Sequence, residues 1–431
     1  MDLRDSQQRM RQLIGRYYLL NRVPVGDETS RFVRELATAN EAPWWSVRSG
    51  DECLTWNIPL KWTVRQASLA TTSGDRIVDF ADHPLYLKSY SAPFAGDVSR
   101  DELARHVVTD EQRPDRIIYD VRAQYAYGPR KEWGFSLPHS TWRELTDDQY
   151  RVNIDVEFTD GEMDVIDWTL PGERPETVFF AAHTCHPGQV NDGIACVAVL
   201  IELFRWLRER SNRRYTYRLI LGPEYYAAAA VLARGVGVNE LRHGVFLDMP
   251  GNGKPLGFSH SFHSDKYIDR VTENVLNHQV TGGFKRGYRK LWGNDEMFYD
   301  GPDFRISTVG IGRDHWPGYH TDADNLDNCD FDQLGETLSV LQAIVDVFES
   351  DGIPQRRYRG PLYQSRYDLY VDFKSNPDGY RALQDSQILM NGRTSCLDIA
   401  ATLGVDYRFI RQFVEQLCDK NLAALAAPRR Q

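Results

Sequence analysis

The order of apolar and polar positions divides the chain into stretches of different character. Residues 1–40 carry apolar side chains at helical spacing and predict two helices separated near residues 24–26. Between about 47 and 160, short segments alternate apolar and polar residues between Gly, Asp and Pro signals, a pattern typical of β-strands. From 161 to 355, strand-like apolar runs alternate with helical patterns. This alternation predicts an α/β fold, a mainly parallel sheet with helices on both faces.

The last part of the chain has a different pattern. Residues 395–424 predict a helix, a turn near Gly404, a second helix and a short wing, which is helix-turn-helix patterning. A linker rich in Arg and Tyr precedes it. The predicted domains are 1–46, N-terminal helices of the main domain; 47–160, an inserted small β domain; 161–355, the main α/β domain; and 356–431, a C-terminal winged helix.

Composition narrows the class of protein. Hydrophobic residues make up 42% and charged residues 26% of the 431 residues, which is usual for a globular protein of two or three domains. The net charge of −10 argues against non-specific electrostatic binding to nucleic acid or to an anionic membrane.

The cysteines and the N-terminus indicate where the protein works. The six cysteines show no CxxC spacing and are interpreted as reduced, buried thiols. The first 20 residues carry charges throughout and lack the apolar core of a signal peptide. No apolar run approaches the 18 or so residues of a membrane helix. A cytoplasmic protein with no membrane partner is therefore expected.

Candidate metal ligands gather where an apolar run ends. Residues 178–182 form a buried strand pattern that stops at His183, and His186 and Asp192 follow in a turn-rich loop. In α/β sheets, active sites lie at the carboxyl ends of strands. With His320 at the end of a later strand, these residues provide the imidazole and carboxylate donors of a catalytic zinc site.

Each of these residues has a simpler interpretation as well. A single histidine is more often a hydrogen-bonded structural residue, but two in one loop beside an aspartate favour a metal. His183 and His186 are not expected to bind the same ion. His186 is preferred as the ligand because it lies in the loop, and strand-end His183 is the alternative.

Glu224 is the candidate general base. It follows the apolar strand pattern of residues 218–223, where a carboxylate could take a proton from a metal-activated water and pass it to a leaving amine. The alternative is a carboxylate that caps the next helix, where the helix dipole favours it. The two roles are compatible.

Further polar residues are candidates for binding the metal or the substrate. Asp248 ends another strand and could bind a metal or cap a turn. Asp295 and Glu296 could hold the amino group of a substrate or could simply be solvated in a loop. Tyr319 and Asp324 flank the late histidine and could orient it.

Four segments together resemble a known superfamily. HTCHPGQVNDG, GPEYYAAA, FLDMPGN and YHTDADNL are similar to motifs of the di-zinc aminopeptidases, a superfamily that also contains glutaminyl cyclases. A closer resemblance is to a bacterial aminopeptidase-like subgroup associated with polysaccharide biosynthesis. That subgroup has a CHP…ND motif, an inserted β domain with W-x-x-P-x-x-W (Trp56, Pro59 and Trp62 here) and WGF (133–135), and a C-terminal winged helix.

The chain departs from the superfamily at one position that matters. The paired carboxylates of the superfamily would be Glu-Glu, and here they are Glu224 and Tyr225. The first, the base, is kept, whereas the second, a ligand of one zinc, is a tyrosine. The resemblance therefore implies one Zn2+ per chain rather than two.

Together these features predict a zinc metallopeptidase, an aminopeptidase-like hydrolase that cleaves the N-terminal amide bond of a peptide or peptide-like metabolite. One alternative is an acyl transferase or cyclase on the same fold, because one metal carboxylate is missing. Another is a ligand-sensing regulator with a degenerate enzyme domain, because of the helix-turn-helix pattern. The acidic chain has little reason to bind DNA through one small module. The β domain and the winged helix offer surfaces for a homodimer.

Overall fold

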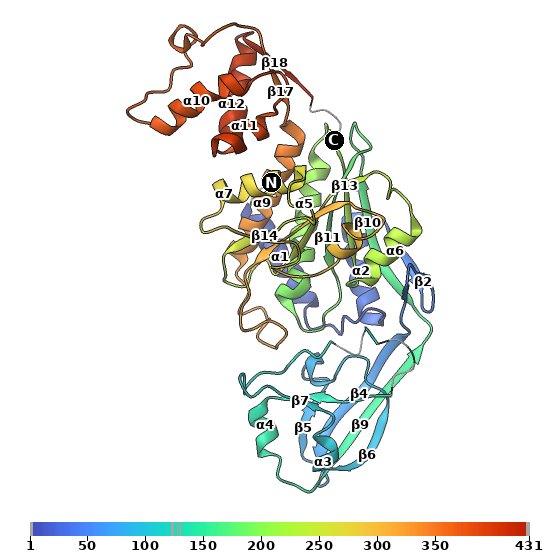
Figure 1. The fold of residues 1–431 in the computed structure, drawn as a ribbon. Helices are drawn as coiled ribbons and strands as arrows, with labels where there is room; N and C mark the ends of the chain where they lie inside the picture. Colours follow the sequence, from blue (N-terminus) through green and yellow to red (C-terminus); the bar gives the residue numbers. More distant parts are fainter. Residues whose placement is uncertain (1–2, 122–124, 127, 129–130, 428–431) are drawn as a thin grey trace.

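The computed structural model describes residues 3–121, 125–126, 128 and 131–427. The predicted domains at the two ends and the inserted β domain thus each include a few residues outside the described ranges. Figure 1 shows a large α/β body in the middle, an antiparallel β lobe at one end, and a group of short helices at the other. No helix in the described ranges combines the length and the apolarity needed to cross a membrane.

The central sheet is mixed but mainly parallel, as predicted. In the part of the chain that the structure describes, it has eight strands in the order β1-β10-β12-β11-β13-β16-β14-β15. The four in the middle, β12, β11, β13 and β16, are mutually parallel, whereas β1, β10 and β14 run antiparallel to their neighbours towards the middle. The bounds are β1 Trp44–Arg48, β10 Glu162–Leu170, β11 Thr177–His183, β12 Thr216–Gly222, β13 Leu241–Asp248, β14 Leu256–Ser259, β15 Phe284–Arg286 and β16 Ser307–Arg313.

Strand β11 lies at the centre of this sheet and is buried along its whole length. Its alternate side chains face two separate cores: Val178 and Phe180 belong to one, and Phe179 and Ala181 to the other. A strand covered on both faces must be apolar throughout, which is why this run shows no polar alternation.

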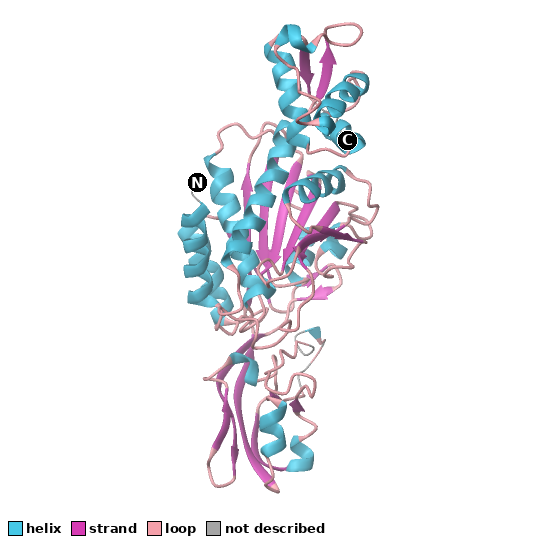
Figure 2. Cartoon of the chain, turned by 90° about the vertical axis from the view of Figure 1, so that its left-hand side faces the viewer, coloured by secondary structure: helices cyan, strands magenta, loops and turns pink. Residues whose placement is uncertain are grey.

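Helices cover both faces of the sheet (Figure 2). The larger core packs against α1 (Leu3–Tyr17), α2 (Asp27–Asn40), α5 (Ala195–Glu209), α7 (Tyr267–Gln279) and α9 (Phe331–Ser350). The other face is covered by α6 (Tyr226–Arg234) and the short α8 (Glu296–Tyr299). Both layers enclose the apolar surface of the sheet, as expected for an α/β domain.

The β lobe is built on an antiparallel sheet with the order β5-β4-β9-β6. Its strands are β4 Lys61–Thr71, β5 Arg76–Asp79, β6 Phe94–Ser99 and β9 Gln149–Thr159. Smaller elements are β2 Glu52–Cys53, β3 Trp56–Asn57, β7 Val107–Val108, β8 Phe135–Ser136, α3 Arg100–Leu103 and α4 His139–Glu144. Trp62 is buried in the lobe and stacks on Tyr90, so it is a core residue. Strand β1 crosses the predicted boundary at residue 47 and joins the central sheet.

The C-terminal part contains α10 (Pro377–Leu389), α11 (Cys396–Leu403) and α12 (Tyr407–Asp419). Strands β17 (Ile353–Arg356) and β18 (Ala423–Ala426) pair antiparallel beside these helices. Gly404 ends α11 with a left-handed φ of 66°. The apolar residues of α11 and α12 belong to the larger core of the main body, so this part packs on the sheet domain.

Gly244 on β13 provides a test of how tightly the central sheet is packed. A Cβ atom there would lie 2.2 Å from Cζ of Phe179 and 2.7 Å from Oγ1 of Thr308. Gly244→Ala should therefore destabilise the protein by about 1–3 kcal/mol, the usual cost of overpacking a core. Gly96→Ala on β6 is the matched control, because its nearest atom is at an ordinary 3.8 Å.

Thermal unfolding followed by circular dichroism measures both variants. The melting temperature should fall for Gly244→Ala and stay close to wild type for Gly96→Ala. Equal melting temperatures for the two variants would contradict the close contact between β13 and β11.

Candidate metal centre

The carboxyl ends of three neighbouring parallel strands meet at one edge of the central sheet. Strand β11 ends at His183, β13 ends at Asp248, and Glu224 follows the end of β12. The loop after β11 adds His186 and Asp192 to the same edge, and the loop after β16 adds His320. The structure thus brings together the candidate residues that the sequence placed at strand ends.

Asp192 lies between two groups of candidate ligands. Its Oδ1 is 3.4 Å from Nε2 of His183, and its Oδ2 is 2.9 Å from Nε2 of His320. One group contains His183, Asp192 and Asp248, and the other contains His186, Asp192 and His320. In each group the ligand atoms lie within 4.8 Å of one another. His183 and His186 also form a group of this kind with Cys185.

The donor atoms of these groups fit a metal ion. Oδ2 of Asp192, Oδ1 of Asp248 and Nε2 of His320 are buried and make no hydrogen bond, since the 2.9 Å contact between Asp192 and His320 lacks hydrogen-bond geometry. Polar atoms buried without a partner are costly, and carboxylate oxygens and imidazole nitrogens are the donors that zinc takes. The residues present therefore fit a zinc ion in either group.

Burial sets the protonation preferences of the cluster. It raises the pKa of Asp192 and Asp248 well above the usual value for Asp. It lowers the pKa of His183 to about 3 and that of His320 to about 4, and it lowers the pKa of His186 well below its usual value. Neutral imidazoles are the form that binds metals, and a cation would offset the cost of burying the two carboxylates.

Neighbouring side chains hold the carboxylates in position. Asp324 accepts hydrogen bonds from the backbone N–H of Asn191 (2.8 Å) and of Asp192 (2.9 Å), and from Nδ2 of Asn191 (3.1 Å). Nδ2 of Asn294 donates to Oδ2 of Asp248 at 2.7 Å, which leaves Oδ1 facing the cluster. Contacts of this kind orient metal ligands. The sequence suggested Asp324 as an orienting residue for His320 rather than for the loop of Asp192, and it did not suggest Asn294.

Arg22 holds the loop that follows β11. It is fully buried between α1 and α2, and its guanidinium donates to the carbonyl oxygens of Thr184 (3.3 Å), His186 (2.8 Å) and Gln189 (2.7 Å). Burial lowers its pKa to about 10, so it stays charged at neutral pH. The sequence did not single out Arg22, because its partners are backbone atoms about 160 residues away.

The backbone around the cluster adopts conformations that side chains disfavour. His186, Tyr225 and His320 have φ values of 85°, 63° and 53°. Gly193 has a φ of 149°, and a Cβ there would lie 2.5 Å from Nδ1 of His183. Strain of this kind persists where the surrounding structure imposes it, commonly at functional sites.

Cys185 contacts both Glu224, the candidate base, and one of the histidines. Its Sγ accepts a hydrogen bond from the N–H of Glu224 at 3.3 Å and lies 3.2 Å from Nδ1 of His186. If Nδ1 donates its proton to the sulfur, Nε2 of His186 keeps a lone pair for a metal. The opposite arrangement, with the thiol as donor, would put the ring proton on Nε2 and block binding there.

Glu224 lies beside the cluster in a buried position. Tyr125 donates a hydrogen bond to its Oε2, and Nε2 of His186 is 3.7 Å from the same oxygen. Burial raises the pKa of Glu224 to about 7; the bond from Tyr125 opposes this shift, and the charge of Asp192 adds to it. A carboxyl of this kind is suited to proton transfer near neutral pH.

The remaining predicted residues lie next to the cluster. Asp295 accepts from the N–H of Tyr225 at 2.7 Å, and Glu296 accepts from the N–H of Asn294 at 2.7 Å. Both are buried rather than solvated. Tyr319 stacks on His320 with ring centroids 3.9 Å apart. Asp295, Glu296 and Tyr319 are thus each held by residues that lie next to the cluster.

Tyr119, which lies between β7 and β8 in the sequence, contacts two of the histidines in the cluster. Its ring makes edge contacts with His186 and His320, each at 5.2 Å between centroids, and its N–H donates to the carbonyl of His320 at 2.9 Å. Ile118 forms a β-bridge with Thr321 next to it. Residues from the insertion thus cover the cluster of candidate ligands, which the strand-end pattern did not predict.

Comparison with known proteins supports the fold. The model of a family described as Domain of unknown function (DUF4910) matches residues 11–351. A Clostridium acetobutylicum protein is 26% identical over 383 residues, 86% of each chain; it is provisionally named as a polysaccharide biosynthesis protein with an aminopeptidase-like domain.

Two solved structures show the same architecture. The crystal structure of a Clostridium acetobutylicum protein, provisionally described as a peptidase, has a TM-score of 0.86, 24% identity and 98% coverage of both chains. The zinc aminopeptidase BSAP from Bacillus subtilis has a TM-score of 0.55 and 11% identity, over 79% of this chain and 94% of its own. The predicted aminopeptidase-like fold is confirmed.

Substitution of Cys185 tests its contact with His186. Cys185→Ala removes the acceptor and should weaken zinc binding by roughly 10–100-fold, the usual effect of losing a group that orients a ligand. Cys185→Ser keeps an acceptor and should lose less. Competition for zinc with a chelating indicator at fixed pH measures both.

The circular dichroism spectra of the two variants serve as the control for folding. Zinc affinity of Cys185→Ala equal to that of the wild type would show that the thiol does not orient His186.

Proposed function

This chain belongs to the family described as Domain of unknown function (DUF4910) and has an aminopeptidase-like fold, and we propose that it is a zinc-dependent hydrolase. Its reaction is cleavage of the N-terminal amide bond of a peptide or peptide-like metabolite. The observation that carries this proposal is the position of Glu224, a buried carboxyl held beside a set of zinc-type donors. The name of the BSAP neighbour, a zinc aminopeptidase, agrees with it.

The proposed zinc ligands are the two groups that share Asp192. His183 and Asp248 complete one group, and His186 and His320 complete the other. The expectation of a single zinc came from the tyrosine at position 225. In the structure, His186 and His320 form a second group of donors around Asp192, so we propose two metal positions per chain, with His183 and His186 each serving one of them.

Glu224 is the proposed general base. A bound zinc ion would polarise the scissile carbonyl and make a water molecule more acidic. Glu224 then takes the proton of the attacking water and delivers it to the nitrogen of the leaving amine. The hydrogen bond from Tyr125 fixes the carboxylate in place for both transfers.

Asp295 and Glu296 provide a reason for preferring a substrate with a free amino group. Both are buried beside Glu224, and burial raises the pKa of Asp295 well above its usual value and that of Glu296 to about 7. An ammonium group nearby would stabilise their charged forms. Tyr319, whose ring stacks on His320, is a further candidate for contact with the substrate.

Acyl transfer remains the competing reaction on this fold, because an amine could attack in place of water. Product analysis in water enriched in oxygen-18 separates the two. Hydrolysis places the heavy oxygen in the new carboxylate, whereas transfer leaves it out.

Substitution of the base is the first test of the proposal. Glu224→Gln keeps the size of the side chain but cannot accept the proton, so turnover of aminoacyl p-nitroanilides should fall by about 10²–10⁴-fold. Zinc content should stay unchanged. Glu41→Gln on the exposed surface is the control and should retain full activity. If Glu224→Gln turns over substrate as fast as the wild-type protein, Glu224 is not the general base.

Metal analysis tests the number of zinc ions. After dialysis against metal-free buffer, elemental analysis should find two zinc ions per wild-type chain and one in His186→Ala. Asp192→Asn should lose both, because the two groups share this carboxylate. His278→Ala, at an exposed position on α7, is the control. One zinc ion per wild-type chain would contradict the two proposed metal positions and would support the single site expected from the tyrosine at position 225.

A further inference from the structure

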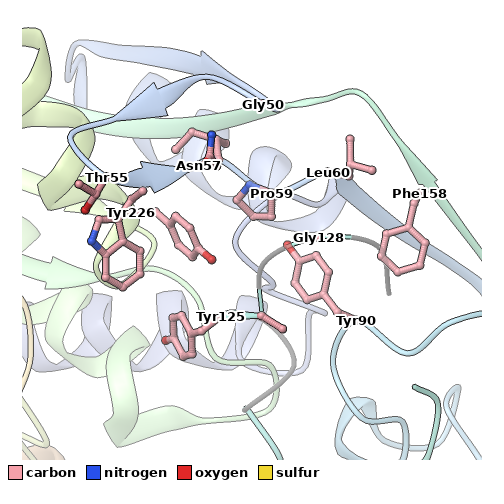
Figure 3. Close-up of a pocket in the computed structure, with 13 residues that line it drawn as sticks. Gly50, Thr55, Asn57, Pro59, Leu60, Tyr90, Tyr125, Gly128, Phe158 and Tyr226 are labelled. Carbon is pink, nitrogen blue, oxygen red and sulfur yellow. The ribbon is translucent and has the colours of Figure 1, made fainter. Parts of the chain in front are cut away.

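A large cavity lies next to the proposed base. Its volume is about 700 Å³, which is in the range of pockets that bury most of a small organic ligand. It lies where the β2–β3 hairpin, the start of α6 and the β lobe meet. Figure 3 shows Pro59, Leu60, Tyr90, Phe158 and Tyr226 around it.

The walls of the cavity are apolar and aromatic. None of the described residues that line it carries a charge; they are Gly50, Thr55, Trp56, Asn57, Ile58, Pro59, Leu60, Tyr90, Tyr125, Ala126, Gly128, Phe158 and Tyr226. A charged group placed there would lose part of its hydration without gaining an ion-pair partner among these described residues, which is unfavourable. The cavity is therefore suited to an uncharged, largely apolar group.

Tyr125 connects this cavity to the chemistry. Its side chain lines the cavity, and its hydroxyl donates to Oε2 of Glu224. Its ring also stacks on Tyr226, which follows Glu224 by two residues. A group in the cavity would thus lie one side chain away from the carboxylate that moves the proton.

We propose that this cavity binds an aromatic or long aliphatic, uncharged group of the amide substrate and so selects the substrate class. The proposal rests on the hydrolase function above, because it takes the cavity as part of the same substrate site. The bulk of the group is packed by Trp56, Leu60 and Phe158, and Asn57 offers one amide for orientation. Apolar groups are distinguished by the contact area that they bury.

Sugars also stack on aromatic side chains, but the cavity favours the apolar group. Each sugar hydroxyl taken from water needs a hydrogen-bond partner. Apart from tyrosine hydroxyls, the side chains among the described lining residues that can hydrogen bond to a sugar are Thr55, Asn57 and the indole of Trp56. The hydroxyl of Tyr125 is already bonded to Glu224, and that of Tyr90 accepts from the N–H of Val25.

The test measures binding without turnover. The full-length Glu224→Gln variant, loaded with zinc, is titrated calorimetrically with L-phenylalaninamide, L-alaninamide, L-lysinamide and N-acetylglucosamine. L-Phenylalaninamide should bind at least tenfold more tightly than L-alaninamide and than L-lysinamide, and N-acetylglucosamine should bind more weakly still. Equal affinity for the phenylalanine and alanine amides, or tighter binding of the sugar, would overturn the proposal.

Two further variants, each made in the Glu224→Gln background, test whether the preference for L-phenylalaninamide arises in the cavity. Leu60→Asp puts a charge at the rim, where the leucine is 43% exposed, and Asn57→Asp puts one in the wall without a change of size. Each should weaken binding of L-phenylalaninamide at least tenfold and leave L-alaninamide unchanged. Leu54→Asp, in the same hairpin but outside the lining and 39% exposed, is the control and should have no effect. Unchanged phenylalaninamide binding in both cavity variants would overturn the proposal.

These results are independent of those for the hydrolase function. A wild-type protein that hydrolyses amides with no preference for apolar groups would contradict the cavity proposal and leave the hydrolase intact. A clear binding preference without turnover of any amide would contradict the hydrolase and leave the cavity as a ligand site.

Discussion

Two buried carboxylates, two buried imidazoles and the partly exposed imidazole of His320 meet at one edge of a mainly parallel sheet, and the surrounding structure has to hold them there. Asp192 and Asp248 lie in a site from which water is largely excluded, and several of the donor atoms around them have no hydrogen-bond partner. A divalent cation bound there would offset the cost of this arrangement, because it would replace the lost hydration of the carboxylates. The fold then has to hold the donors close together while the metal is absent.

Several neighbouring groups perform that task. Asp324 fixes the loop that carries Asp192, and the guanidinium of Arg22 holds three carbonyl oxygens of the segment that carries His186. Tyr119 adds a cover from the insertion. A single site therefore links the N-terminal helices, the sheet and the β-rich insertion, which explains why segments so distant in sequence must fold together.

Sequence patterns predicted the sheet and its polar edge because both follow from local periodicity. The apolar run before His183 and the helical pattern at 331–350 correspond to β11 and α9. The supporting contacts were not predictable in the same way. Arg22 bonds to backbone atoms and Tyr119 comes from an insertion, so neither contact follows from local periodicity.

In the proposed site, Asp192 serves two metal positions. Anomalous scattering at the zinc absorption edge, recorded from crystals of the zinc-loaded protein, tests it directly. Two peaks are expected next to Asp192, one near His183 and Asp248 and the other near His186 and His320. A single peak, or peaks away from Asp192, would contradict it.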